Sequence, residues 1–184
     1  MTPEMLQDAL CMEIRKLLSE RKFKKPPKEL EEPDLESLYE DFEENFQGDI
    51  EVKESELELV PIAVYPQNIP VPLSSEEYNP VPYIVVKLKG GIDENTYDSK
   101  YIVNVVGIIG IWDDERDAQG HRELLNIINL VYARFKKNPC LDGRYSYDGG
   151  FRWGIQEEDY YPYYFGAFEM NFAIPAIRRE DSLC

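Results

Sequence analysis

The stretch YIVNVVGIIGIW, residues 101–112, decides the fold because it is apolar on both faces apart from Asn104. A strand that is exposed on one side alternates apolar and polar residues, whereas a continuous apolar run is typical of a central, covered strand. We therefore expect residues 101–112 to lie in the middle of a sheet, with helices or another subunit on each side. Gly107 and Gly110 indicate a bulge or the close approach of a neighbouring backbone.

Shorter strand patterns surround this run. Residues 83–89 alternate, and Gly90-Gly91 is expected to end them before a polar turn over 92–100 that completes a hairpin. Residues 57–65 predict a strand that Pro61 limits to an edge position or a bulge. The prolines between 66 and 82 predict an extended loop, and residues 140–150 a second one. Alternating patterns over 151–156 and 167–174 complete the sheet, with a tyrosine-rich turn between them.

Two amphipathic helices are predicted. Thr2 and Pro3 are a good start for a helix over residues 3–21, and the acids at 113–117 precede a second helix that runs to about Lys136. The order helix, strands, helix, strands predicts an α+β fold, as one domain over 1–184. We expect a mainly antiparallel twisted sheet with both helices packed on one face. Residues 28–58, rich in Glu and Asp, predict a partly helical acidic insertion.

The composition excludes several classes of function. The chain has 36 acids and 20 basic residues, and its net charge of −16 disfavours direct binding to nucleic-acid phosphates. Such charge gives solubility, or an acidic surface that faces a basic partner or lines a pore. Cys11, Cys140 and Cys184 are too widely spaced for a zinc site or a disulfide framework, which fits a reducing cytoplasm. Glu4 and Asp8 argue against a signal peptide, and no apolar run is long enough for a membrane span.

Catalytic motifs are scarce. His121 is the only histidine, and no serine or cysteine lies in a nucleophile motif, so we interpret His121 as a surface or capping residue. No glycine-rich phosphate loop or other cofactor motif is present. The acids at 113–117 could offer oxygens to Mg²⁺ or Ca²⁺, but they lack the alternating spacing of a calcium loop. We interpret them as capping the helix that follows.

One tripeptide leaves an enzymatic alternative open. Glu51-Val52-Lys53 matches the Glu-x-Lys of a metal-dependent nuclease core, in which carboxylates hold a metal and the lysine orients a water. An earlier acid would come from Asp34, Asp41 or Asp49. The net charge leaves a further alternative, an acidic DNA mimic that inhibits a DNA-binding protein.

The densest aromatic cluster follows three acids, Glu157, Glu158 and Asp159. Aromatic rings can stack on bases, but a nucleic-acid groove also needs basic side chains, which these neighbours do not supply. Tyrosines are favoured at protein interfaces, so the cluster predicts hairpin packing or a contact with another protein. The candidate interface residues are Trp112, Asp113, Asp114, Tyr160, Tyr161, Tyr163 and Tyr164.

Five segments carry a resemblance when they are taken in order: GIWDDE (110–115), QGHRELLN (119–126), FRW (151–153), DYYPYYFG (159–166) and PAIRRED (175–181). Over roughly residues 60–181 the chain resembles the tail-completion or tail-terminator (neck) proteins of tailed bacteriophages and prophages of Gram-positive bacteria. The acidic residues 28–58 have no counterpart in this resemblance.

The resemblance implies a helix-and-sheet subunit that assembles as a ring, commonly a hexamer. Such a ring caps the finished tail tube and joins it to the head connector, and it has no active site or cofactor. The implied partners are other copies of the chain, the tail tube protein and the head–tail connector protein. The implied location is the bacterial host cytoplasm during assembly and then the tail or neck of the virion.

Overall fold

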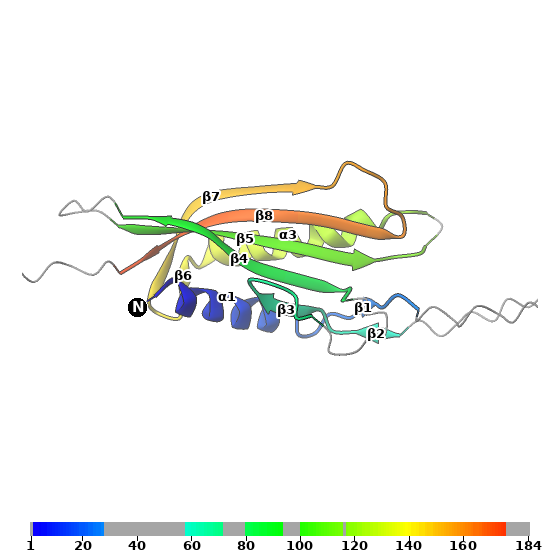
Figure 1. Cartoon of the computed structure of the whole chain (residues 1–184), viewed down its shortest axis with the longest axis horizontal. Coiled ribbons are helices and arrows are strands. Elements are labelled where there is room, and N and C mark those ends of the chain that lie inside the picture. The colour runs from blue at the N-terminus through cyan, green and yellow to red at the C-terminus, as the bar shows by residue number, and fades with distance from the viewer. Residues whose placement is uncertain (1, 28–57, 72–79, 94–99, 116, 176–184) are drawn as a thin grey trace, which may run out of the picture.

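The computed structural model describes residues 2–27, 58–71, 80–93, 100–115 and 117–175 (Figure 1). The strands and helices follow the predicted order of helix, strands, helix, strands. They are α1 (Pro3–Leu17), β1 (Phe23–Lys24), β2 (Leu59–Val60), β3 (Ala63–Pro66), β4 (Tyr83–Ile92), β5 (Tyr101–Trp112), α3 (Gly120–Lys137), β6 (Cys140–Leu141), β7 (Tyr145–Ile155) and β8 (Tyr163–Ile174).

The main sheet has six strands in the order β3-β4-β5-β8-β7-β6. Strand β5 is central, as predicted, and pairs antiparallel with β8 along its whole length and with β4 over residues 102–110. Among the strands of the described ranges, only β3 and β4 run parallel to each other. Strands β1 and β2 form a separate two-stranded ladder. The fold is therefore α+β with a mainly antiparallel sheet, in agreement with the sequence pattern.

Both helices pack on one face of this sheet, which confirms the prediction (Figure 1). Alternate residues of β5, such as Val105 and Ile109, are fully buried on that face. Leu10 of α1 and Leu124 of α3 belong to the same core. The apolar stripe predicted for residues 120–137 is the buried side of α3. None of the helices in the described ranges is long and apolar enough to cross a bilayer.

On the other face of β5, of the two covers that the sequence predicted, only another subunit stays open as a prediction. Within the described residues no helix covers it, and Ile102, Val106 and Ile108 are half-buried there. Large side chains from neighbouring strands provide part of the shielding. The ring of Tyr83 lies so close to Gly110 that a Cβ at this glycine would be 2.6 Å from it. Both faces of β5 are apolar, although helices cover only one.

Several predicted boundaries are wrong, and long-range pairing explains each one. Helix α1 ends at Leu17 instead of residue 21 because residues 23–24 pair with β2. Strand β4 continues through Gly90-Gly91 to Ile92, with a register shift at the first glycine. The expected loop over 140–150 contains β6 and the first half of β7. Its glycines, Gly149 and Gly150, have positive φ angles of 93° and 69° and produce an irregular register against β8 instead of a loop.

The edge position predicted for residues 57–65 is confirmed for β3, and Pro61 separates this strand from β2. The glycine in the middle of β5 also behaves in part as expected. A Cβ at Gly107 would lie 2.1 Å from the ring of Phe168, so the close approach is real, although it involves a side chain. The pairing of β5 with β8 is continuous, and the bulge expected at this position is absent.

Candidate functional site

The candidate interface residues meet at one end of the sheet, where β5 ends and β8 begins. Trp112 pairs with Tyr163 in the last position of that ladder. Residues 113–115, here the acidic turn, therefore lie against residues 159–163, here the tyrosine turn. The Asp113 N–H donates a hydrogen bond to the Pro162 carbonyl at 2.9 Å. The Tyr161 hydroxyl donates to the Asp114 carbonyl at 2.9 Å, so two bonds join the turns.

The acidic turn is held by a lysine that is distant in sequence. Nζ of Lys24, in β1, lies 2.5 Å from an oxygen of Asp113 and 2.7 Å from one of Glu115. Asp114 is 3.8 Å away. Burial lowers the pKa of Lys24, but hydrogen bonds to Asp113 and Glu115 outweigh this effect, and the pKa is raised overall. One cation thus compensates part of the charge of three carboxylates.

The acids at 113–117 do not cap α3, so that interpretation is wrong. The N-cap is Gln119, and its side chain makes no capping hydrogen bond. Asp117 instead accepts a hydrogen bond from the Gln119 N–H at 3.2 Å, just before the helix starts. The pairing of Asp113 and Glu115 with Lys24 explains the difference, because it directs these two carboxylates toward β1.

The tyrosine turn is compact and exposes two aromatic rings. The Tyr163 N–H donates to the Tyr160 carbonyl at 2.8 Å, and Asp159 accepts from the Tyr161 N–H at 3.0 Å. The Tyr160 hydroxyl donates to Glu158 at 2.8 Å, and this bond raises the pKa of Tyr160. Tyr160 and Tyr161 remain 50% and 47% exposed. Exposed tyrosines on a fixed turn are suited to contact with another protein.

Trp112, Tyr163 and Tyr164, also in the candidate set, pack beneath the tyrosine turn against the rest of the protein. Trp112 is only 7% exposed. The ring of Tyr164 packs so closely on the first residue of α3 that a Cβ at Gly120 would lie 2.3 Å from it. Burial raises the pKa of Tyr164. Tyr163 stacks on Phe165, with ring centroids 6.4 Å apart. The members of the candidate set that are exposed, and so free to contact another molecule, are therefore Tyr160, Tyr161 and Asp114.

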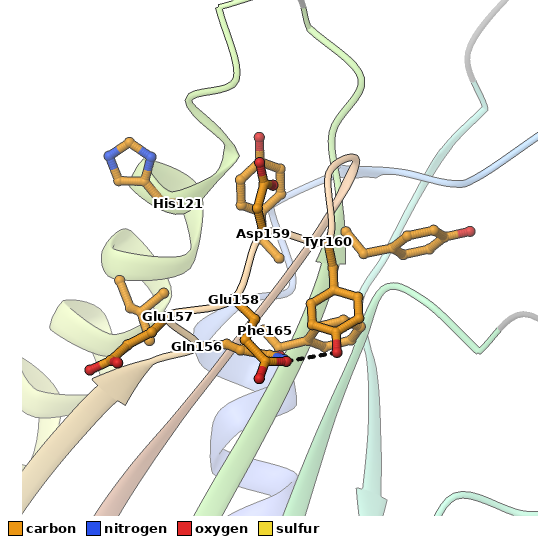
Figure 2. Close-up of a pocket in the computed structure, with 10 residues that line it drawn as sticks. His121, Gln156, Glu157, Glu158, Asp159, Tyr160 and Phe165 are labelled. Carbon is orange, nitrogen blue, oxygen red and sulfur yellow. Dashed lines mark hydrogen bonds between the residues drawn. The ribbon is translucent and has the colours of Figure 1, made fainter.

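An open cleft of about 230 Å³ lies beside the tyrosine turn (Figure 2). Glu157, Glu158 and Asp159 line it together with Tyr160, and His121 stands on the α3 side. No serine or cysteine is among its lining residues. Among the described residues no three His, Cys, Asp or Glu side chains converge in a metal-binding group. The cleft presents carboxylates and aromatic rings, a lining that suits a basic side chain of a partner.

Two sequence hypotheses, the metal-dependent nuclease site and the partly helical acidic insertion over 28–58, fall on residues outside the described ranges, apart from Glu58. Glu51 and Lys53, with the acids Asp34, Asp41 and Asp49, lie within 28–57. That segment also holds 13 of the 36 acids against two lysines, a net charge of −11 out of −16. The rest of the chain is therefore close to balanced, and the acidity predicted for its surface is concentrated between β1 and β2.

Sequence reasoning missed Lys24 and Gly120. The ion pair of Lys24 with Asp113 spans 89 residues, so no local pattern could reveal it. Gly120 could have been found from the sequence, because a glycine at the start of a helix leaves space for a ring of the nearby aromatic cluster.

The chain matches no protein-family model and no curated protein to which it has been compared.

Proposed function

We propose that this chain is a structural subunit of a tailed phage or prophage, a tail terminator or tail-completion protein that forms a ring between the tail tube and the head connector. The observation that carries the proposal is the position of the segments on which the resemblance rests. Three of its five segments, residues 110–115, 119–126 and 159–166, come from two parts of the sequence and meet at one end of the sheet.

The surface at that end supports a contact between proteins. Tyr160 and Tyr161 are exposed, and Tyr161 is fixed by its hydrogen bond to the acidic turn. A preformed aromatic contact loses little conformational entropy when it binds. Charged residues beside the rings add orientation, because complementary charges steer partners into register. A ring requires such a surface to meet a different surface of the next copy.

The test uses variants that leave the turn folded. Tyr160→Ala removes a half-exposed ring, and Met5→Ala removes a side chain of the same 50% exposure from α1. We expect Tyr160→Ala to weaken ring assembly by at least about 30-fold, the effect of an interface hot spot. Met5→Ala should leave assembly unchanged. Equal assembly of both variants, measured by mass photometry, would remove the tyrosine turn from the ring contact.

Asp114→Lys tests the charge of the same surface. Asp114 is the more exposed of the two aspartates and lies 3.8 Å from Lys24, whereas Asp113 makes the shorter, half-buried contact. Reversing Asp114 therefore changes the surface charge and spares the main ion pair. We expect slower assembly with a weaker salt dependence. An unchanged association rate at low salt would contradict a role for this carboxylate.

The two alternatives have direct tests. A metal-dependent nuclease requires DNA cleavage that Glu51→Ala abolishes, with Asp93→Ala as a control acid in a described part of the chain. A DNA mimic requires tight, salt-sensitive binding to a protein with a basic groove. That binding would depend on residues 28–57, where most of the net charge lies.

A further inference from the structure

The two edges of the six-stranded sheet are chemically different. At the β3 edge, the Ala63 N–H donates inward to the Pro82 carbonyl, so alternation turns Val64 and Pro66 outward. The Val64 carbonyl already accepts a hydrogen bond from Arg15, and Pro66 has no N–H. The Val64 N–H is then the one donor that this part of the edge offers, and an edge with an occupied carbonyl and a proline is a poor template for a further strand.

The opposite edge, formed by β7, has no such protection (Figure 1). Strand β6 pairs only with the first two residues of β7, and no other strand in the described ranges lies outside it. The Gln156 N–H donates to the Phe165 carbonyl at 3.0 Å, which fixes the direction of the backbone. By alternation, the N–H and C=O groups of Trp153 and Ile155 point away from the sheet.

Apolar side chains accompany these outward backbone groups. Phe151, Trp153 and Ile155 lie on the face of the sheet that carries the helices, and Trp153 is 57% exposed. Phe151 packs against Tyr132 of α3, which is itself 39% exposed, with ring centroids 5.0 Å apart. An open edge flanked by exposed aromatic rings is a template for pairing with another strand.

We propose that the β7 edge pairs antiparallel with β7 of a second copy of this chain, about a two-fold axis at Trp153. An axis perpendicular to the sheet keeps the helices of both copies on one side, so opposite residues share a face. The register places Phe151 opposite Ile155 of the partner subunit. Arg152 then lies opposite Gly154 of the partner subunit. An axis at Arg152 would instead bring two positive charges together, which is unfavourable.

Self-complementarity favours a second copy over a different strand. The two Trp153 residues exchange backbone hydrogen bonds across the axis, and the flanking pairs bring apolar side chains together. Each copy uses its edge once, so the contact stops at a dimer, whereas a ring needs two different surfaces. The proposal therefore does not depend on the phage assignment.

Disulfide trapping tests the register. Directly opposed, hydrogen-bonded residues have Cα atoms about 5.5 Å apart, within the range of a disulfide. In a full-length background with Cys140→Ser and Cys184→Ser, Trp153→Cys should cross-link within minutes of mild oxidation. Ile155→Cys is the matched control, because its two copies would be offset by four residues, roughly 14 Å. Cross-linking at 155 and not at 153, or at both equally, would overturn the proposal.

Sedimentation tests the contact without a cysteine. Trp153→Lys places a charge on the edge and should weaken the dimer at least about 30-fold. Met12→Lys makes the same kind of change at a 61% exposed residue of α1 and should leave the dimer intact. At a protein concentration low enough for every chain to be monomeric, both variants should unfold at the same urea concentration as the unmodified chain. A chain that stays monomeric at every concentration, or a dimer that both variants retain, would overturn the proposal.

Discussion

Replacing Lys24 by methionine should destabilise the protein by about 2–3 kcal/mol. The contact with Asp113 is 2.5 Å long and joins side chains that are 21% and 19% exposed, so it has the character of a charge-assisted hydrogen bond, about 1.5–3 kcal/mol. Glu115 is 61% exposed, and its 2.7 Å contact adds less than about 1 kcal/mol. Methionine keeps the apolar stem of lysine, so the loss reports the charge.

Lys25 provides the control. It lies next in the chain and pairs with Glu58 at 3.1 Å, but the two side chains are 36% and 66% exposed. Solvent screens such a pair, and Lys25→Met should cost about 0.5 kcal/mol or less. Urea unfolding followed by circular dichroism gives both values, and the melting temperature should fall by about 4–12 °C for Lys24→Met. If the two variants agreed within about 0.5 kcal/mol, the acidic turn would not be held by Lys24.

Two further predictions concern the core and the pH dependence. Gly107→Ala should lower the free energy of unfolding in urea by about 3 kcal/mol, because the new Cβ would meet the buried ring of Phe168. Gly154→Ala is the control, because its Cβ meets open space, and it should change stability by less than about 0.5 kcal/mol. Similar losses in the two variants would contradict the packing of Phe168 on Gly107. The pKa of Lys24 is raised in the folded protein. The contribution of its charge to the free energy of unfolding is therefore complete below the unfolded pKa of about 10.4, and it is lost as the pH rises through the folded pKa. The gap between the unmodified chain and Lys24→Met should therefore be constant from about pH 7 to 9 and shrink near pH 11, and an earlier loss would contradict this assignment.

The architecture was predictable wherever periodicity was strong. The two-sided apolar run became the central strand, and the stripe of residues 124–135 became the buried side of α3. The expected alternation over 167–174 is seen in β8. These patterns arise within a single element, where the positions of side chains follow directly from the period of a strand or helix.

The errors arose where a distant partner competes with local preference. Glycines usually end strands, but Gly90, Gly91 and Gly149 stay in the sheet because neighbouring strands pair with them. The first helix ends at Leu17, before the predicted residue 21, and residues 23–24 pair with β2. The candidate site shows the same limit. Its members from β5 and β8 could be grouped because consecutive strand ends meet, but Lys24 could not be grouped with them.

The structure also changes what the acidic residues of the sequence are expected to do. Asp113 and Glu115 were expected to cap a helix and are instead bound to Lys24. Most of the remaining charge is carried by residues 28–57. The surface that we propose for assembly is therefore smaller than the sequence suggested and centres on Tyr160, Tyr161 and Asp114.

The most direct test of the proposed function is the mass of the purified full-length chain in solution, combined with negative-stain electron microscopy. If the chain is a ring-forming subunit, we expect closed rings of identical subunits, with six-fold symmetry implied by the phage resemblance. Trp153→Lys should leave these rings intact, because the dimer contact of β7 is separate from ring closure. A chain that forms only monomers and dimers over the whole concentration range, with no ring in the micrographs, would contradict the account.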